Sequence, residues 1–173
     1  FDKTNRNTPV DLIDVTVSER VVVSISAGTA HSCFLNDNHV ISCGGTNDFC
    51  NVTHTGCYDD DYYYRDQGNT FDWVSVGDLH TCGLLHSTGG VECWVYTSGS
   101  NPLSHFLINA NSNQFNRFEF YPIIIGATQI FSRFETTCIS NGSCVECWGG
   151  NINGQQGRGS SNPEGLVNGR GFG

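Results

Sequence analysis

The chain has 173 residues and a formal net charge of −9; charged residues make up only 14 %, hydrophobic residues 38 % and aromatic residues 12 %. This composition is typical of a folded domain with a core and argues against disorder. An acidic chain without a cluster of Lys or Arg repels phosphate backbones, so we expect no nucleic-acid partner. No apolar run is long enough to cross a membrane, so we expect no membrane span.

The first predicted unit spans residues 21–45. It opens on an alternating apolar stretch, continues through Cys33, turns at residues 36–38 and ends on a strand through Cys43. Turns rich in Asn, Asp, Ser and Gly link antiparallel strands because these residues tolerate positive φ. The pattern therefore predicts three short antiparallel strands.

Two later segments repeat this pattern, at residues 73–96 and 128–159. In each, a turn separates a strand with one cysteine from a strand with another. The first cysteines of the three units, Cys33, Cys82 and Cys138, are 49 and 56 residues apart. A period of about 50 residues is typical of propellers and solenoids. We therefore predict an all-β fold with little helix, in which about three repeated antiparallel sheets form part of a propeller or solenoid, in a single repeat domain (1–173).

The nine cysteines predict a disulfide framework. Two of them bracket the turn of each unit and two more bracket a separate loop, as partners on neighbouring strands would. The predicted pairs are Cys33–Cys43, Cys50–Cys57, Cys82–Cys93 and Cys138–Cys147. Alternation along a strand turns Cys144 away from Cys147, so Cys144 is either a free thiol or an intermolecular link. Disulfides at this density favour an extracellular, secreted protein over a structural zinc site.

The spacers between the units are long and unlike each other. The first carries the acidic run Asp59, Asp60 and Asp61, followed by Tyr62, Tyr63 and Tyr64. The acidic run is a weak Ca²⁺ candidate, because its spacing is not that of an EF-hand and a solvated loop explains it more simply. The tyrosines either cover the loop or contact a sugar or a protein partner.

The second spacer holds an aromatic stretch that includes Phe115 and Phe118. It is either an outer strand with a surface loop or a contact surface for a neighbouring subunit. Two acceptor sequons begin at Asn51 and Asn141 and fall in predicted turns, so N-linked glycans are expected.

No motif of nucleophilic, metal-dependent or nucleotide-dependent catalysis is present, and we expect no enzyme, no cofactor and no metal. The six histidines are scattered along the chain. His31 and His80 hold equivalent positions, which favours hydrogen bonds inside each blade over a metal pair. Trp94 and Trp148 are also equivalent and are interpreted as packing residues.

A longer motif appears in the third unit, where Cys147-Trp148-Gly149-Gly150-Asn151 is followed by Gly154-Gln155-Gln156-Gly157. This run resembles the regulator-of-chromosome-condensation repeat, in which Cys-Trp-Gly-x-Asn precedes Gly-Gln-x-Gly. The first unit, with Ala27-Gly28 before His31-Ser32-Cys33, is similar to the start of the same repeat, and the second unit lacks the glycine-rich tail. The resemblance implies a β-propeller, typically of seven four-stranded blades, of which this chain is a fragment or an assembling part.

Members of that family have several roles, so the fold does not set the function. The leading hypothesis is a secreted, disulfide-stabilised structural or interaction module. It would assemble with copies of itself, with another extracellular protein or within a larger chain, as a scaffold or filament component. Residues 10–25 are the candidate for a strand donated to a neighbour. The alternative is a binding module, either a glycan-binding lectin or a protein inhibitor.

Overall fold

The structure, a computed structural model, describes residues 21–45, 63–65, 69–96, 115–120, 126–150 and 153–157; for 63–65, 95–96 and 115–120 it describes the backbone. These ranges form three antiparallel sheets and contain no helix, which confirms the predicted all-β fold. Within them, no helix exists that could span a membrane.

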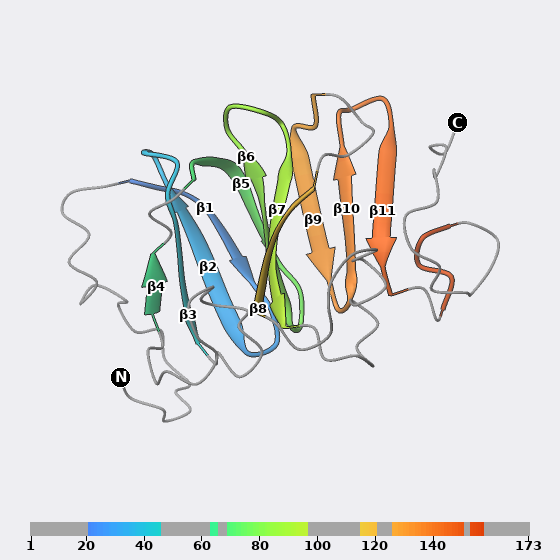
Figure 1. Cartoon of the computed structure of the whole chain (residues 1–173), viewed down its shortest axis with the longest axis horizontal. Coiled ribbons are helices and arrows are strands. Elements are labelled where there is room, and N and C mark those ends of the chain that lie inside the picture. Colours follow the sequence, from blue (N-terminus) through green and yellow to red (C-terminus); the bar gives the residue numbers. More distant parts are fainter. Residues whose placement is uncertain are drawn as a thin grey trace.

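Each sheet corresponds to one predicted unit. Blade 1 contains β1 (Val22–Ala27), β2 (His31–Asn36), β3 (Ile41–Gly45) and β4 (Tyr63–Arg65), in that order. Blade 2 contains β5 (Phe71–Val76), β6 (His80–Leu85), β7 (Val91–Tyr96) and β8 (Phe115–Phe120). Blade 3 contains β9 (Gln129–Arg133), β10 (Thr136–Ser140) and β11 (Val145–Gly149). The blades follow one another along the long axis of the molecule (Figure 1).

The hydrophobic core lies between the blades rather than inside a single sheet. Alternating side chains of a strand point to opposite faces, so each blade buries both faces when a neighbour stands on each side. One cluster joins blades 1 and 2: Cys33, Leu35, Ile41, Cys43, Phe71, Val74, Val76, Leu85 and Trp94. The other joins blades 2 and 3: Cys82, Leu84, Val91, Cys93, Ala127, Ile130, Ile139 and Trp148. Trp94 and Trp148 are thus packing residues, one in each cluster.

Three of the predicted disulfides are present in the described residues, each between directly opposed residues of a hairpin: Cys33–Cys43, Cys82–Cys93 and Cys138–Cys147. The partners are 10, 11 and 9 residues apart in sequence. Closing a loop of this size contributes roughly 2–3 kcal/mol in the chain-entropy model. Each crosslink therefore fixes the central hairpin of its own blade.

Gly28 allows the closest approach between blades 1 and 2. A Cβ atom added at this position would overlap the carbonyl oxygen of Gly77 and press on the Val76 side chain. A backbone carbonyl cannot move aside as a side chain can. We therefore expect Gly28→Ala to lower the free energy of unfolding by about 1–3 kcal/mol, the usual cost of overpacking, in guanidinium unfolding.

Gly89→Ala is the matched control. A Cβ atom at Gly89 would meet nothing within 4 Å, and the only penalty is its positive φ of 64°. That penalty is about 1 kcal/mol. If Gly28→Ala lowered the free energy of unfolding no more than Gly89→Ala does, the claim that blades 1 and 2 approach closely at Gly28 would be wrong.

Candidate functional site

A histidine–threonine hydrogen bond recurs at the two blade interfaces. His31 Nε2 on β2 lies 2.8 Å from Thr81 Oγ1 on β6. His80 Nε2 on β6 lies 2.8 Å from Thr137 Oγ1 on β10. The interpretation of these histidines as hydrogen bonders inside one blade is therefore wrong: each reaches across to the next blade. The reason is that β2 and β6 turn these side chains toward the following sheet.

Both histidines are buried. Desolvation lowers the pKa of His31 from 6.5 to about 4. Desolvation also lowers the pKa of His80 to about 4, with a further lowering by the charge of His31 and an opposing effect of Asp78. Both imidazoles are consequently neutral near pH 7, and the interfaces are joined by neutral hydrogen bonds.

A serine–backbone hydrogen bond recurs in the same way. The amide of Val76 donates to Ser26 Oγ at 2.9 Å, and the amide of Ser132 donates to Ser75 Oγ at 2.6 Å. Blades 1 and 2 thus each have a forward face, which offers His and Ser to the next blade. Blades 2 and 3 each have a rear face, which offers Thr and a backbone amide to the preceding blade. The two faces are complementary.

The rear face of blade 1 is uncovered. Offsets of 49 and 56 residues place Ile25, Val74 and Ile130 at equivalent positions. Val74 is 1 % exposed and Ile130 is fully buried, whereas Ile25 is 79 % exposed. Val22, the equivalent of buried Phe71, is also exposed. The apolar side chains that pack against the preceding blade in blades 2 and 3 are therefore exposed at the equivalent positions of blade 1.

The forward face of blade 3 is uncovered as well. Val145, two residues before the second cysteine of its blade, is 37 % exposed, whereas the equivalent Ile41 and Val91 of the other blades are buried. The Cys138–Cys147 disulfide is half-buried, whereas the other two disulfides are buried between blades. The described stack therefore ends on an apolar face on both sides.

An open groove of about 410 Å³ crosses all three blades where the innermost strands end. It is lined by residues 27–29, 76–78 and 132–134. Thr29 Oγ1 donates to Asp78 Oδ1 at 2.5 Å, and the Arg133 guanidinium lies 5.3 Å from the centre of the Phe134 ring. The lining offers a carboxylate, a guanidinium and an exposed aromatic ring, but no Ser–His or Cys–His pair.

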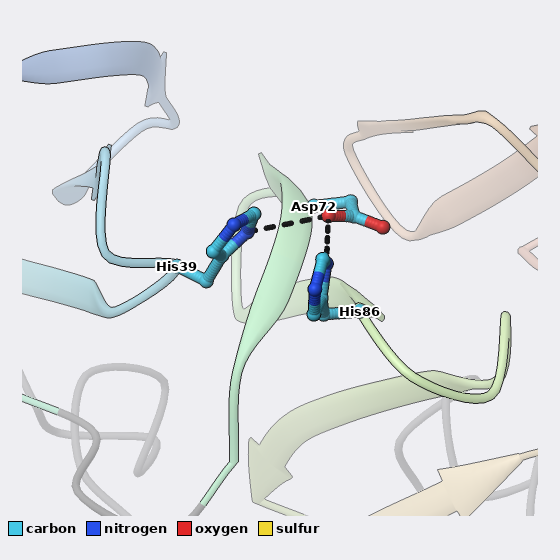
Figure 2. Close-up of side chains that lie close together, drawn as sticks. All are labelled: His39, Asp72 and His86. Carbon is cyan, nitrogen blue, oxygen red and sulfur yellow. Dashed lines mark hydrogen bonds and ion pairs between the residues drawn. The ribbon is translucent and has the colours of Figure 1, made fainter.

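A second polar cluster lies at the edge of the blade 1–blade 2 interface. His39, Asp72 and His86 come from the β2–β3 turn, from β5 and from the residue after β6, and both imidazoles point toward the carboxylate (Figure 2). His86 Nδ1 lies 2.6 Å from Asp72 Oδ1, and His39 Nδ1 lies 3.3 Å from the same atom. The sequence analysis missed this cluster, because nothing in the spacing of three residues from separate elements indicates that they meet.

The remaining candidate residues fall in several places. Cys144 is exposed and forms no disulfide. Asn141 lies in the β10–β11 turn, where its Oδ1 accepts from the amides of Ser143 and Cys144 at 3.0 and 2.9 Å. The predicted sites outside the described residues are Cys50, Asn51, Cys57, Asp59, Asp60, Asp61 and Tyr62.

The backbone accounts for part of the aromatic spacers. Tyr63 and Tyr64 belong to β4, and Phe115 and Phe118 belong to β8, so these residues lie on the outer strands of blades 1 and 2. The second spacer thus contains an outer strand, as one interpretation predicted, at residues 115–120. Its role as a contact surface stays a prediction. The candidate donor strand is partly wrong, because Val22 to Ile25 already pair with β2 in their own blade.

No family model and no curated protein matches this chain. Solved structures do match. Human WBSCR16 is 19 % identical with a TM-score of 0.67, over 91 % of this chain and 41 % of that protein. Yeast RCC1 (Prp20), in its complex with Kap60, is 13 % identical with a TM-score of 0.58, over 78 % of this chain and 31 % of that protein. The CRINKLY WD40 ectodomain of the Arabidopsis thaliana receptor kinase ACR4 is 22 % identical with a TM-score of 0.50, over 76 % of this chain and 41 % of that one.

The described chain thus spans about two fifths or less of the length of these structures. At such identities the likeness concerns the fold alone. The repeated antiparallel sheets, the core between them and these matches lead to one conclusion: the described residues form three consecutive blades of a β-propeller-type fold.

Proposed function

We propose that this protein is an extracellular, disulfide-stabilised structural module that joins end to end with further blades of the same construction. Those blades belong to other copies of this chain or to a larger chain that contains it. The module acts as a scaffold or filament component and carries out no catalysis.

The observation that carries the proposal is the bare position of Ile25. At the two equivalent positions, Val74 and Ile130, a preceding blade excludes water almost completely. Leaving a large aliphatic side chain in water instead of burying it forfeits about 1.5–3 kcal/mol. Ser32, the equivalent of the buried threonine that receives the histidine, is exposed too. The rear face of blade 1 has the composition of an interface and lacks only its neighbour.

The forward face of blade 3 supplies the second surface, although Thr136 and Phe131 stand there in place of the histidine and serine of blades 1 and 2. It presents the exposed Val145 side chain and the half-buried disulfide, both apolar. A contact between two different surfaces of identical subunits is heterologous, so it repeats until the assembly closes into a ring or grows as a filament. Exposed Cys144 offers a thiol for a covalent link between neighbours.

The extracellular setting rests on sulfur chemistry. Three disulfides within fewer than 120 residues persist in oxidising compartments and are rare where thiols are kept reduced. N-linked glycans at Asn51 and Asn141 fit the same setting, since both sequons are of the acceptor type.

Sedimentation velocity across a concentration series tests the proposal. In a Cys144→Ser background, which removes covalent links, the chain is expected to self-associate. Ile25→Asp is expected to make it monomeric, because a buried unpaired carboxylate costs several kcal/mol at an interface. Ser87→Asp adds the same charge at an exposed turn of blade 2 and should leave association intact. A chain that stays monomeric at every concentration would refute joining between copies of this chain.

A further inference from the structure

We propose that His39, Asp72 and His86 bind a divalent transition-metal ion of the Zn²⁺ class, which ties blade 1 to blade 2. The proposal is independent of the end-to-end assembly, because the three residues lie at the interface inside the chain. It rests on the geometry of the cluster, on how the backbone holds it and on a comparison with the equivalent positions of the other blades.

The ligand atoms are already gathered. One donor atom from each of the three residues lies within 4.8 Å of the other two. Metal–nitrogen and metal–oxygen bonds of about 2.0–2.1 Å in a tetrahedral site put neighbouring ligand atoms roughly 3.3 Å apart. The 3.3 Å between His39 Nδ1 and Asp72 Oδ1 matches that spacing. His86 Nδ1, at 2.6 Å from the carboxylate, has to withdraw by less than an ångström, which exposed side chains do easily.

Backbone hydrogen bonds hold the cluster together. The amide of Phe71 donates to the carbonyl oxygen of His39 at 2.8 Å, and the amide of His86 donates to the carbonyl oxygen of Thr70 at 2.9 Å. Both histidines are thereby fastened to the segment that carries Asp72. A site whose ligands are fixed in advance loses less conformational entropy on binding.

A carbonyl group also orients the His39 ring. His39 Nδ1 lies 3.0 Å from the carbonyl oxygen of Phe71. A metal ion bound at Nδ1 replaces the proton that Nδ1 otherwise donates to this carbonyl, and Nε2 then carries the ring proton.

The backbone at His39 is strained, and the equivalent position in blade 2 is not. His39 has a φ of 64°, and Gly89, four residues before the second cysteine of its blade just as His39 is, has the same φ of 64°. Glycine adopts this conformation freely, whereas another residue loses about 1 kcal/mol. The geometry of the turn therefore does not explain why a histidine stands at position 39.

The other two ligands are also absent from the repeat. Val23 and Thr128 stand at the positions equivalent to Asp72, and Asp37 stands at that equivalent to His86. The stacking of blades therefore does not need the cluster, since the blade 2–blade 3 interface forms without it. The centroids of the His39 and His86 rings are 4.0 Å apart, and the Asp72 carboxylate beside them is 45 % exposed.

The donor set selects the kind of ion. Two imidazoles and one carboxylate suit Zn²⁺, Cu²⁺ and Ni²⁺, whereas Ca²⁺ and Mg²⁺ require mostly oxygen ligands. Three protein ligands leave a fourth position for water or for a group from a partner, because all three side chains are 41–48 % exposed. The ion would join the β2–β3 turn of blade 1 to β5 and the end of β6 in blade 2.

The test is a Zn²⁺ titration of the full chain by isothermal calorimetry, in the Cys144→Ser background so that the exposed thiol does not bind the ion. One ion is expected at this site, and Ca²⁺ is not expected to compete for it. The variants are His39→Asn, Asp72→Asn and His86→Gln; asparagine at position 39 tolerates the positive φ. Each is expected to weaken binding about 10-fold or more.

Asp37→Asn is the matched control, since it removes one carboxylate from the turn that carries His39 without removing a ligand. It should keep the affinity within about 3-fold, the size of a long-range charge effect. Thermal unfolding without metal shows whether each variant is folded, and added Zn²⁺ should raise the unfolding temperature of the parent but not of the three variants. Undetectable Zn²⁺ binding, or equal binding by the parent and all three variants, would overturn the proposal.

Discussion

Acidification from pH 6.5 to pH 4 is expected to destabilise the protein by about 5 kcal/mol, roughly 2.5 kcal/mol for each of the two interface histidines. In the native state, burial lowers the pKa of His31 and of His80 from 6.5 to about 4. In the unfolded chain the same imidazoles take up protons near pH 6.5. Between these values the unfolded state binds more protons, so the free energy of unfolding rises with pH across the window and is fully recovered above it.

Guanidinium unfolding at several pH values between 4 and 7.5 measures this effect. The His31→Gln variant retains a neutral hydrogen-bonding group toward Thr81 and loses one titrating site, so its stability should change less steeply with pH, by about one proton. The stability of the double variant, His31→Gln with His80→Gln, should depend on pH less steeply still. An unchanged slope in the double variant would contradict the assignment of the effect to the blade interfaces.

The second large effect compares one substitution at two equivalent positions. Ile130→Ala, at a fully buried site between blades 2 and 3, is expected to cost about 2–5 kcal/mol, from lost transfer free energy and the cavity left behind. Ile25→Ala removes the same atoms from a side chain that is 79 % exposed, and should change stability by less than about 0.5 kcal/mol. Equilibrium unfolding at a concentration at which the chain is monomeric gives both values.

The pair controls for chemistry, because both variants remove the same atoms from a β-strand at the same place in the repeat. If the two substitutions lowered the free energy of unfolding equally, Ile25 would be buried, and the claim that the rear face of blade 1 is exposed would be wrong. Measuring the same two variants at concentrations at which the chain self-associates separates folding from assembly. Ile25→Ala should weaken self-association without lowering the free energy of unfolding appreciably.

The sequence predicts those features that depend on neighbours within one blade. The turns and the pairing of Cys33 with Cys43 involve residues within about ten positions of each other, and local spacing is enough to fix them. The burial of Trp94 and Trp148 follows from their equivalence. The bulge between Phe71 and Trp73 is harder to foresee, because it breaks the simple alternation that sequence patterns rely on.

Features that depend on the stacking of blades were not predictable in the same way. The partner of His31 is Thr81, 50 residues further along the chain, and no local pattern indicates which side of the sheet faces the next blade. His39, Asp72 and His86 meet only because a turn of blade 1 reaches the start of blade 2. Likewise, Ile25 and Val74 have the same place in the repeat and differ only in whether a blade stands in front of them.

Photo-crosslinking from the forward face of blade 3 tests the central claim most directly. A benzoylphenylalanine in place of Val145 stands at the position equivalent to Val91, which packs against the following blade. After irradiation and digestion, mass spectrometry should find crosslinks from one copy of the chain to residues 22–32 of another. Crosslinks that stay within one molecule, or that join copies through other surfaces, would contradict end-to-end joining of the blades.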